Sequence, residues 1–137
     1  MKRKLSKSLP IILTMTIVIS AIIIAPVTVS AANTADSIVD IARAEIGNSY
    51  YQKYNGHKNA WCADFVTWCA KQAGVSSIAS SSSCYNMYMG MKDSCERVYS
   101  PQKGDIVFFY CNKCSTTAGK WCHVGIMEDS TYSIEGN

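Results

Sequence analysis

Residues 61–69 read Trp-Cys-Ala-Asp-Phe-Val-Thr-Trp-Cys, and this stretch decides which fold the chain can adopt. Its apolar positions recur at helical spacing, so it predicts a helix from about Trp61 to Gln72, closed by Gly74. Cys62 then lies in the first turn and faces the body of the protein. Free backbone N–H groups and the positive end of the helix dipole favour a thiolate there. The same N–H groups can stabilise an oxyanion when the thiolate attacks a carbonyl.

A second stretch, Cys-His-Val-Gly-Ile at residues 122–126, supplies an imidazole at the start of a predicted strand. The chain has only two histidines, and the other, His57, follows a glycine in a polar loop and is expected at the surface. A thiol and an imidazole that the fold brings together make a nucleophile and a base. Cys62 and His123 are therefore the candidate catalytic pair.

Residues 123–127 and 131–135 predict two strands joined by a three-residue turn. In that register His123 lies directly opposite Glu135, and opposed side chains share a face with Cβ atoms about 5 Å apart. Glu135 is then placed to hold the imidazole in one tautomer, and Asn137 lies on the same face two residues on. A two-residue turn would send Glu135 to the opposite face, so the hypothesis requires an odd loop length.

The other elements follow from periodicity and from turn residues. An apolar stripe predicts a helix from Asn33 or Thr34 to about Ile46, stopped by Gly47. Residues 105–110 consist of Asp105 followed by five β-branched and aromatic residues, and this run predicts a strand buried on both faces. The remaining expectations are an aromatic-rich loop at 48–59, a serine-rich loop at 76–83, a short helix at 84–91, a turn at 101–104 and a cysteine-containing loop at 111–121.

Residues 1–31 have the order of a secretory signal peptide. Four basic residues precede an uncharged apolar run at 9–25, and small residues follow at 29–31. A membrane anchor is the alternative, but the run is at the short edge of the roughly 20 residues that a span needs, and it ends at Pro26. We expect cleavage after Ala31 or Ala32, which leaves residues 32–137 as one small domain that meets a membrane only if the leader is uncleaved.

The charge balance excludes a nucleic-acid surface. The whole chain carries thirteen Lys and Arg against ten Asp and Glu, but four of the cations belong to the leader. Removing these four from thirteen leaves nine cations against ten anions. The basicity is therefore part of the targeting signal, and no nucleic-acid partner is expected.

If the protein is exported as expected, its seven cysteines can form disulfides, because thiols can oxidise outside the cytoplasm. Seven is odd, so at least one thiol stays free or pairs outside the chain. A catalytic Cys62 would account for the odd thiol, although Cys69 could also be a buried free thiol. We expect disulfides among the other five, with Cys84–Cys95 favoured; these five are Cys84, Cys95, Cys111, Cys114 and Cys122.

A zinc site is the alternative for the same region. Cys111, Cys114, Cys122 and His123 fit a set of three thiolates and one imidazole, and His123 would then be a ligand in a cysteine-rich binding module. Two observations argue against it. Adjacent Cys122 and His123 point to opposite faces of a regular strand, and the compartment is oxidising.

Four motifs in sequence order resemble the CHAP domain, a family of cysteine, histidine-dependent amidohydrolases/peptidases related to the NlpC/P60 group. The motifs lie at residues 61–69, 104–109, 123–126 and 134–137, and the resemblance covers roughly residues 38–137. It implies a papain-like α+β fold with N-terminal helices packed on a small antiparallel sheet. The family's sheet usually continues beyond the last motif, whereas this chain stops at Asn137, so we expect a sheet truncated at its C-terminal end.

The resemblance implies a bacterial peptidoglycan hydrolase, secreted or at the cell surface, that cleaves an amide bond. Both an N-acetylmuramoyl-L-alanine amidase and an endopeptidase fit. Cys62 matches the nucleophile, His123 the base and Glu135 the residue that orients the histidine, while Asn137 matches a polar position of some members. The non-catalytic alternatives are a cysteine-rich zinc- or disulfide-stabilised wall-binding module and a degenerate wall-binding domain.

Two further expectations concern cofactors and substrate. Some CHAP domains bind calcium through an Asp-rich loop before the cysteine, but residues 48–61 hold no Asp or Glu, so we expect no metal and no cofactor. Trp61 and Tyr54 precede the nucleophile and could line a groove for a glycan or peptide. Aromatic packing over a thin core is the alternative for both.

Overall fold

The computed structural model describes residues 31–58, 60–113 and 120–137, and the side chains from Thr34 onward within them. The apolar run of the expected leader and Cys114 therefore lie outside the described residues. Within the described ranges, no helix combines the length and the hydropathy that a membrane span requires.

In the described part of the chain three α-helices precede the sheet, close to their predicted positions. α1 spans Ala31–Ala44, α2 spans Cys62–Gln72 and α3 spans Cys84–Met91. Gly47 and Gly74 follow α1 and α2 with positive φ angles of 86° and 70°, the conformation that makes glycine a helix stop. A 3-10 helix, η1 at Tyr51–Tyr54, interrupts the segment that the sequence predicts as a loop.

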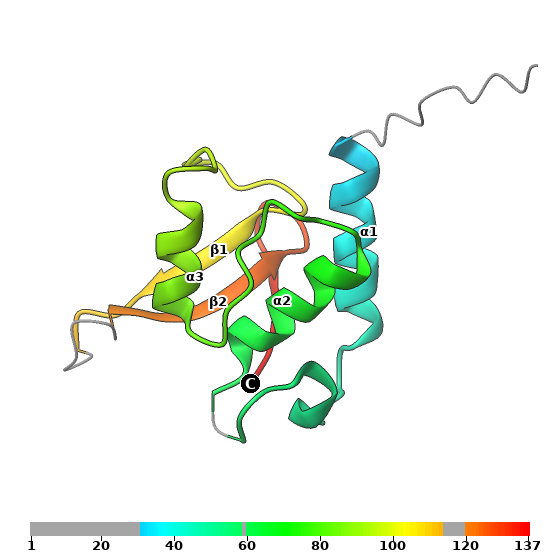
Figure 1. Ribbon diagram of the computed structural model, residues 1–137. Helices are drawn as coiled ribbons and strands as arrows, with labels where there is room; N and C mark the ends of the chain where they lie inside the picture. The colour runs from blue at the N-terminus through cyan, green and yellow to red at the C-terminus, as the bar shows by residue number, and fades with distance from the viewer. Residues whose placement is uncertain (1–30, 59, 114–119) are drawn as a thin grey trace, which may run out of the picture.

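The sheet contains three antiparallel strands in the order β1-β2-β3. β1 spans Ile106–Tyr110, β2 spans Trp121–Met127 and β3 spans Ser133–Glu135. The helices α2 and α3 lie across one face of the sheet, and α1 lies beside α2 (Figure 1). The α+β arrangement predicted from the sequence is confirmed.

One prediction about the sheet is wrong. β1 is expected to be buried on both faces, yet none of its residues is fully buried, and Phe109 and Tyr110 are 38% and 52% exposed. Among the described residues the helices cover one face of the sheet, and β1 is one of its two edge strands. A run of apolar residues cannot by itself distinguish a strand covered twice from one covered once.

A β-bulge separates the two ends of β2. Phe109 pairs with His123, but Tyr110 pairs with Trp121, so Cys122 is the extra residue on β2. Trp121 consequently turns toward the helices, where its ring stacks on Tyr88 of α3 at a centroid distance of 4.3 Å. His123 stays on the opposite face.

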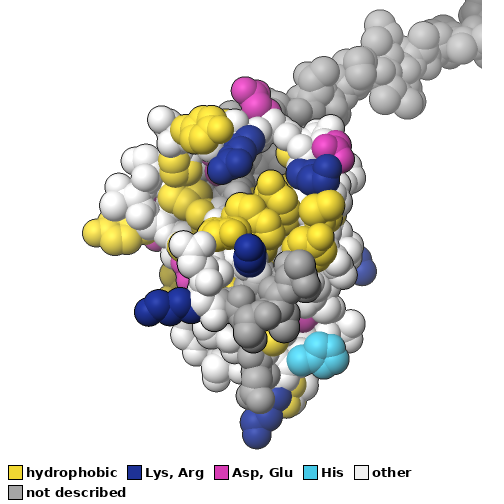
Figure 2. Space-filling view, turned by 90° about the vertical axis from the view of Figure 1, so that its left-hand side faces the viewer, with side chains coloured by type: hydrophobic (Ala, Val, Ile, Leu, Met, Phe, Trp, Pro, Cys, Tyr) yellow, Lys and Arg dark blue, Asp and Glu magenta, His cyan; other side chains and the backbone are white. Residues whose placement is uncertain are grey.

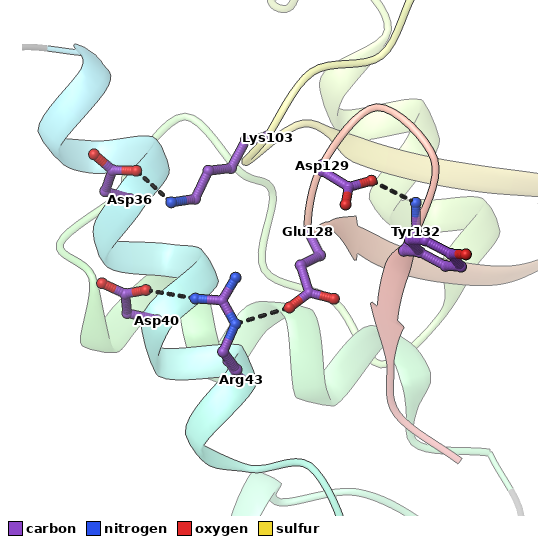
Figure 3. Close-up of polar contacts among 7 residues, drawn as sticks. All are labelled: Asp36, Asp40, Arg43, Lys103, Glu128, Asp129 and Tyr132. Carbon is purple, nitrogen blue, oxygen red and sulfur yellow. Dashed lines mark hydrogen bonds and ion pairs between the residues drawn. The ribbon is translucent and has the colours of Figure 1, made fainter.

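The β2–β3 connection is longer than predicted, but its number of residues is odd, as the hypothesis requires. Met127 pairs with Ser133 and Gly125 with Glu135, so the loop comprises five residues, 128–132, and the predicted direct pairing of His123 with Glu135 is wrong. The N–H of Glu128 donates to the carbonyl of Tyr132 at 2.8 Å. The Asp129 carboxylate accepts from two backbone N–H groups, one of them on Tyr132 (Figure 3). Five is odd, so Glu135 still lies on the face of His123.

Ion pairs fasten α1 to the two loops that flank the sheet. Arg43 bonds both Asp40 on its own helix and Glu128 at the start of the β2–β3 loop, and Lys103 bonds Asp36 (Figure 3). All three pairs are solvent-exposed, so each contributes little to stability. Two of them, Arg43–Glu128 and Lys103–Asp36, join α1 to the loops at the ends of the strands.

The chain after β3 passes closely over the start of α2. A Cβ built on Gly136 would lie 2.6 Å from the Cβ of Phe65 and 2.9 Å from the ring of Trp61. Only glycine fits this approach without a backbone shift. The contact holds the end of β3 against the first turn of α2.

Gly136→Ala should therefore lower the free energy of unfolding by about 1–3 kcal/mol, because the added methyl group overpacks this contact. Urea denaturation monitored by circular dichroism measures the change. Ser130→Ala, at an exposed loop position of the same hairpin, is the control and should stay within about 0.5 kcal/mol of the unchanged protein. Equal stabilities for the two variants would contradict the close approach.

Candidate active site

Cys62 is the first residue of α2, as predicted, and its side chain is 6% exposed. The N-cap residue, Trp61, makes no side-chain capping hydrogen bond. The first N–H groups of α2 are therefore not occupied by a capping side chain. They remain available to a negative charge on the thiol or on a reacting carbonyl oxygen.

The sulfur of Cys62 lies at the edge of β2, beyond the end of β3. β3 pairs with β2 only from Gly125 to Met127. The N–H of Met127 donates toward β1, to the Asp105 carbonyl, and N–H groups alternate between the two edges of an antiparallel strand. The N–H of Val124 thus points to the other edge, where its hydrogen bond helps to lower the pKa of the Cys62 thiol.

His123 and Glu135 form a hydrogen-bonded pair beside this thiol. The distance from His123 Nε2 to Glu135 Oε2 is 2.9 Å. An ionised carboxylate can only accept, so Nε2 carries the proton, and Nδ1 is left for the thiol. Ser133 Oγ donates to the second oxygen of Glu135 and holds the carboxylate in place. On the other side, the ring of Phe109 lies 5.6 Å from the imidazole.

A second thiol touches the candidate nucleophile. Cys84, the first residue of α3, places its sulfur 3.3 Å from the sulfur of Cys62, and both residues are buried. The hydrogen bond from Cys84 is the largest cause that lowers the pKa of Cys62 to about 6. His123, through charge and hydrogen bonding, and the Val124 N–H lower it further, against the opposing effect of burial.

The other two buried thiols have raised pKa values. Contact with the Cys62 sulfur and burial raise the pKa of Cys84, which therefore stays protonated and acts as the donor in the pair. Burial raises the pKa of Cys69 to about 12. Cys62 is the thiol of the core that is suited to be a nucleophile near neutral pH.

The cysteine pairing differs from the sequence prediction. The thiols of Cys84 and Cys95 are both free, so the favoured Cys84–Cys95 disulfide is not present. Cys84 faces Cys62 instead, and the Cys95 thiol donates to the carbonyl of Ser77 at 3.6 Å. Any pairing that involves Cys114 lies outside the described residues.

The structure adds three residues that the sequence reasoning misses at this site. Ser133 carries a detectable signal, since it precedes Glu135 by two residues on the same strand and must share its face. The position of Phe109 beside the imidazole depends on the register of β1 against β2. The position of Cys84 beside Cys62 depends on the path of the loop at 76–83. Neither of these can be read from local periodicity.

The remaining predicted site residues lie as follows. Asn137 is exposed, with a positive φ of 94°, and the described contacts include no hydrogen bond from it to the thiol or the imidazole. Tyr54 and Trp61 are buried and stack on each other at 5.2 Å, and the Tyr54 hydroxyl donates to Glu45. This position agrees with the aromatic-packing alternative. The roles of all three in binding or catalysis stay predictions.

The zinc alternative finds no support among the residues that the structure describes. No group of three or more His, Cys, Asp and Glu side chains in the described ranges is arranged to hold a metal ion. Of the proposed ligands, Cys114 lies outside these ranges. Cys122 donates to the Phe109 carbonyl at 3.7 Å, and His123 bonds Glu135.

A cavity of about 460 Å³ lies elsewhere, between α3, β1 and the segment that joins them. Its apolar lining includes Met91, Val98 and Phe108, and none of the lining residues is Cys62, His123 or Glu135. Hydrophobic side chains with Lys and Arg among them gather on this side of the molecule (Figure 2). The cavity is therefore separate from the thiol–imidazole site.

The fold and the site define a small α+β domain in which a thiol at a helix start meets an imidazole–carboxylate pair on the sheet. The family model of the CHAP domain matches residues 52–137, which is more than half of the chain, and the protein belongs to this family. CHAP domains are generally hydrolases that act on peptidoglycan, at the outside or surface of bacterial cells. The chain matches no curated protein and no solved structure.

The lowered pKa of Cys62 predicts a specific alkylation profile. Iodoacetamide should modify Cys62 with a midpoint near pH 6, because only the thiolate reacts, while Cys69 should stay unmodified through neutral pH. Cys84→Ala should move the midpoint upward, because it removes the hydrogen-bond donor that lowers the pKa of Cys62 most. Mass spectrometry of the two cysteines over a pH series measures both. A midpoint near the usual pKa of about 8.5 in the unchanged protein would contradict the site geometry.

Proposed function

We propose that this protein is an exported cysteine hydrolase that cleaves an amide bond of bacterial peptidoglycan. Cys62 is the nucleophile, His123 the general base and acid, and Glu135 the residue that orients His123. The observation that carries the proposal is the convergence of an ionisable Cys62 thiol with the His123–Glu135 pair in a CHAP domain. Export rests on the leader-like order of residues 1–31.

Acylation uses the thiolate and the helix start. The Cys62 sulfur attacks the amide carbonyl carbon, and the first N–H groups of α2 stabilise the resulting oxyanion. The protonated imidazole of His123 then donates its proton to the nitrogen of the leaving amine. The C–N bond breaks, and a thioester on Cys62 remains.

Deacylation returns the enzyme to its starting state. His123, now neutral, takes a proton from a water molecule that attacks the thioester carbonyl. The C–S bond breaks, the carboxylic acid product leaves, and the thiolate is regenerated. Glu135 stabilises the imidazolium in both halves because its carboxylate accepts from Nε2 at 2.9 Å.

Two amide bonds of peptidoglycan fit this chemistry. An N-acetylmuramoyl-L-alanine amidase separates the glycan from the stem peptide, and an endopeptidase cuts within the peptides. Mass analysis of the muropeptides released from purified walls distinguishes the two. The first releases free stem peptides, and the second leaves the glycan-linked stems in place.

Cys62→Ala should abolish hydrolysis, lowering the rate of amine release from purified cell walls by at least about 10³-fold, because the covalent step is lost. Cys95→Ser is the matched control and should retain the activity, since Cys95 lies on the loop after α3 and its thiol bonds only backbone and a neighbouring serine. Full amine release by Cys62→Ala would refute the proposal. Wall binding without release of amines by the unchanged protein would favour a binding module.

Glu135→Gln should lower kcat by about 10²-fold or more, because a neutral amide no longer stabilises the imidazolium. Glu128→Gln makes the same chemical change on the same hairpin, at a residue that pairs with Arg43, and should leave kcat unchanged. The pH dependence of kcat/KM separates a change in the His123–Glu135 pair from a loss of folded protein. Equal effects of the two substitutions would show that Glu135 has only a structural role.

A further inference from the structure

Cys84 forms no covalent bond in the proposed hydrolysis, yet its sulfur lies 3.3 Å from that of Cys62. The two residues begin different helices, α2 and α3, and are separated by 22 positions in the chain. Cys62 is 6% exposed and Cys84 is 9% exposed. A disulfide bond is about 2.05 Å long, so the two sulfurs must approach each other further to form one.

Hydrogen bonds hold Cys84 in this position. The segment just before it is bound to α2, since Ser82 Oγ donates to the buried Asp64 carboxylate and Thr67 Oγ1 bonds both the N–H and the carbonyl of Ser81. Ser83 caps α3 by accepting from the N–H of Asn86. The start of α3 is therefore attached directly to the helix that carries Cys62.

We propose that Cys62 and Cys84 form a redox-active dithiol site, in which Cys84 closes a reversible disulfide with Cys62 after a peroxide has oxidised it. The inference that this disulfide switches off hydrolysis rests on the proposed function, whereas disulfide formation itself does not. The geometry that carries the proposal is the pair of facing, buried sulfurs and the hydrogen bonds that fix Cys84 beside α2.

The chemistry proceeds in two balanced steps. The Cys62 thiolate attacks one oxygen of hydrogen peroxide or of an organic hydroperoxide, which gives a sulfenic acid and releases hydroxide or alkoxide. The Cys84 thiol then attacks the sulfenic sulfur, the S–S bond forms, and the hydroxyl group leaves with the thiol proton as water. The two sulfurs together have lost two electrons to the peroxide, and a thiol reductant reverses the reaction by disulfide exchange.

The dithiol has a protective consequence for an exported protein. A sulfenic acid without a nearby thiol is oxidised further to sulfinic acid, which ordinary thiol reductants do not reverse. A resolving thiol already in contact with Cys62 intercepts the sulfenic acid before that step. Oxidation then stores the nucleophile as a disulfide and does not destroy it.

Peptide mapping of the full chain tests disulfide formation directly. The reduced protein is treated with hydrogen peroxide, its free thiols are blocked with N-ethylmaleimide, and tryptic peptides are analysed by mass spectrometry. We expect a disulfide between the peptide of residues 59–71 and the peptide of residues 72–92. Because Cys69 shares the first peptide with Cys62, fragmentation must place the bond on Cys62. A bond on Cys69, or no bond between these peptides, would overturn the proposal.

Activity and variants provide the second readout. Peroxide should inactivate the unchanged protein, and dithiothreitol should restore it, whereas Cys84→Ser should accumulate Cys62 sulfinic acid and stay inactive. Cys95→Ser is the matched control and should behave like the unchanged protein. Recovery of Cys84→Ser by dithiothreitol to the same extent as the unchanged protein would contradict the role of Cys84.

The two proposals fail in distinguishable ways. A Cys62–Cys84 disulfide in a protein whose reduced form releases no amines from peptidoglycan would refute the proposed hydrolase and leave the dithiol standing. Amine release by the reduced protein without a Cys62–Cys84 disulfide after peroxide would refute the dithiol alone.

Discussion

The start of α2 meets β2 where β3 has ended, and the whole site depends on this junction. A longer β3 would pair with the N–H of Val124 and occupy the place of the Cys62 sulfur, since that N–H points to the β3 edge. A β3 ending one residue earlier would remove Glu135 from the sheet. The three-residue length of β3 therefore has two consequences. It leaves the edge of β2 beside Val124 open for the Cys62 thiol, and it holds the Glu135 carboxylate beside His123.

The contact between His123 and Glu135 could be predicted from the sequence although its register could not. The face on which a side chain lies depends only on whether the loop length is odd or even, and both the predicted and the observed loop are odd. The actual length follows from backbone hydrogen bonds to the Asp129 side chain and within the loop, which composition does not specify. Glu135 thus reaches His123 diagonally, past Gly125, and not from the directly opposed position.

The helices could be predicted because their periodicity and their terminal glycines are local signals, and α3 matches its predicted bounds. The burial of β1 and the partner of Cys84 depend on what lies across from them, which is tertiary information. The cysteine count predicts that Cys62 or Cys69 stays free and that Cys84 belongs to a disulfide. In the structure the Cys84 thiol is free and lies beside that of Cys62, because hydrogen bonds to Asp64 and Thr67 hold the loop at 81–83 against α2.

The bulge at Cys122 places the side chains of Trp121 and His123, which belong to the same strand, on opposite faces of the sheet. In a regular strand Trp121 and His123 would project on the same side, and a large indole would compete for space with the imidazole. The extra residue reverses the side on which Trp121 projects, so its ring joins Tyr88 beneath α3. The packing of Trp121 at one end of β2 and the His123–Glu135 pair at its middle thus lie on opposite faces of the sheet, and the two groups of side chains do not compete for space.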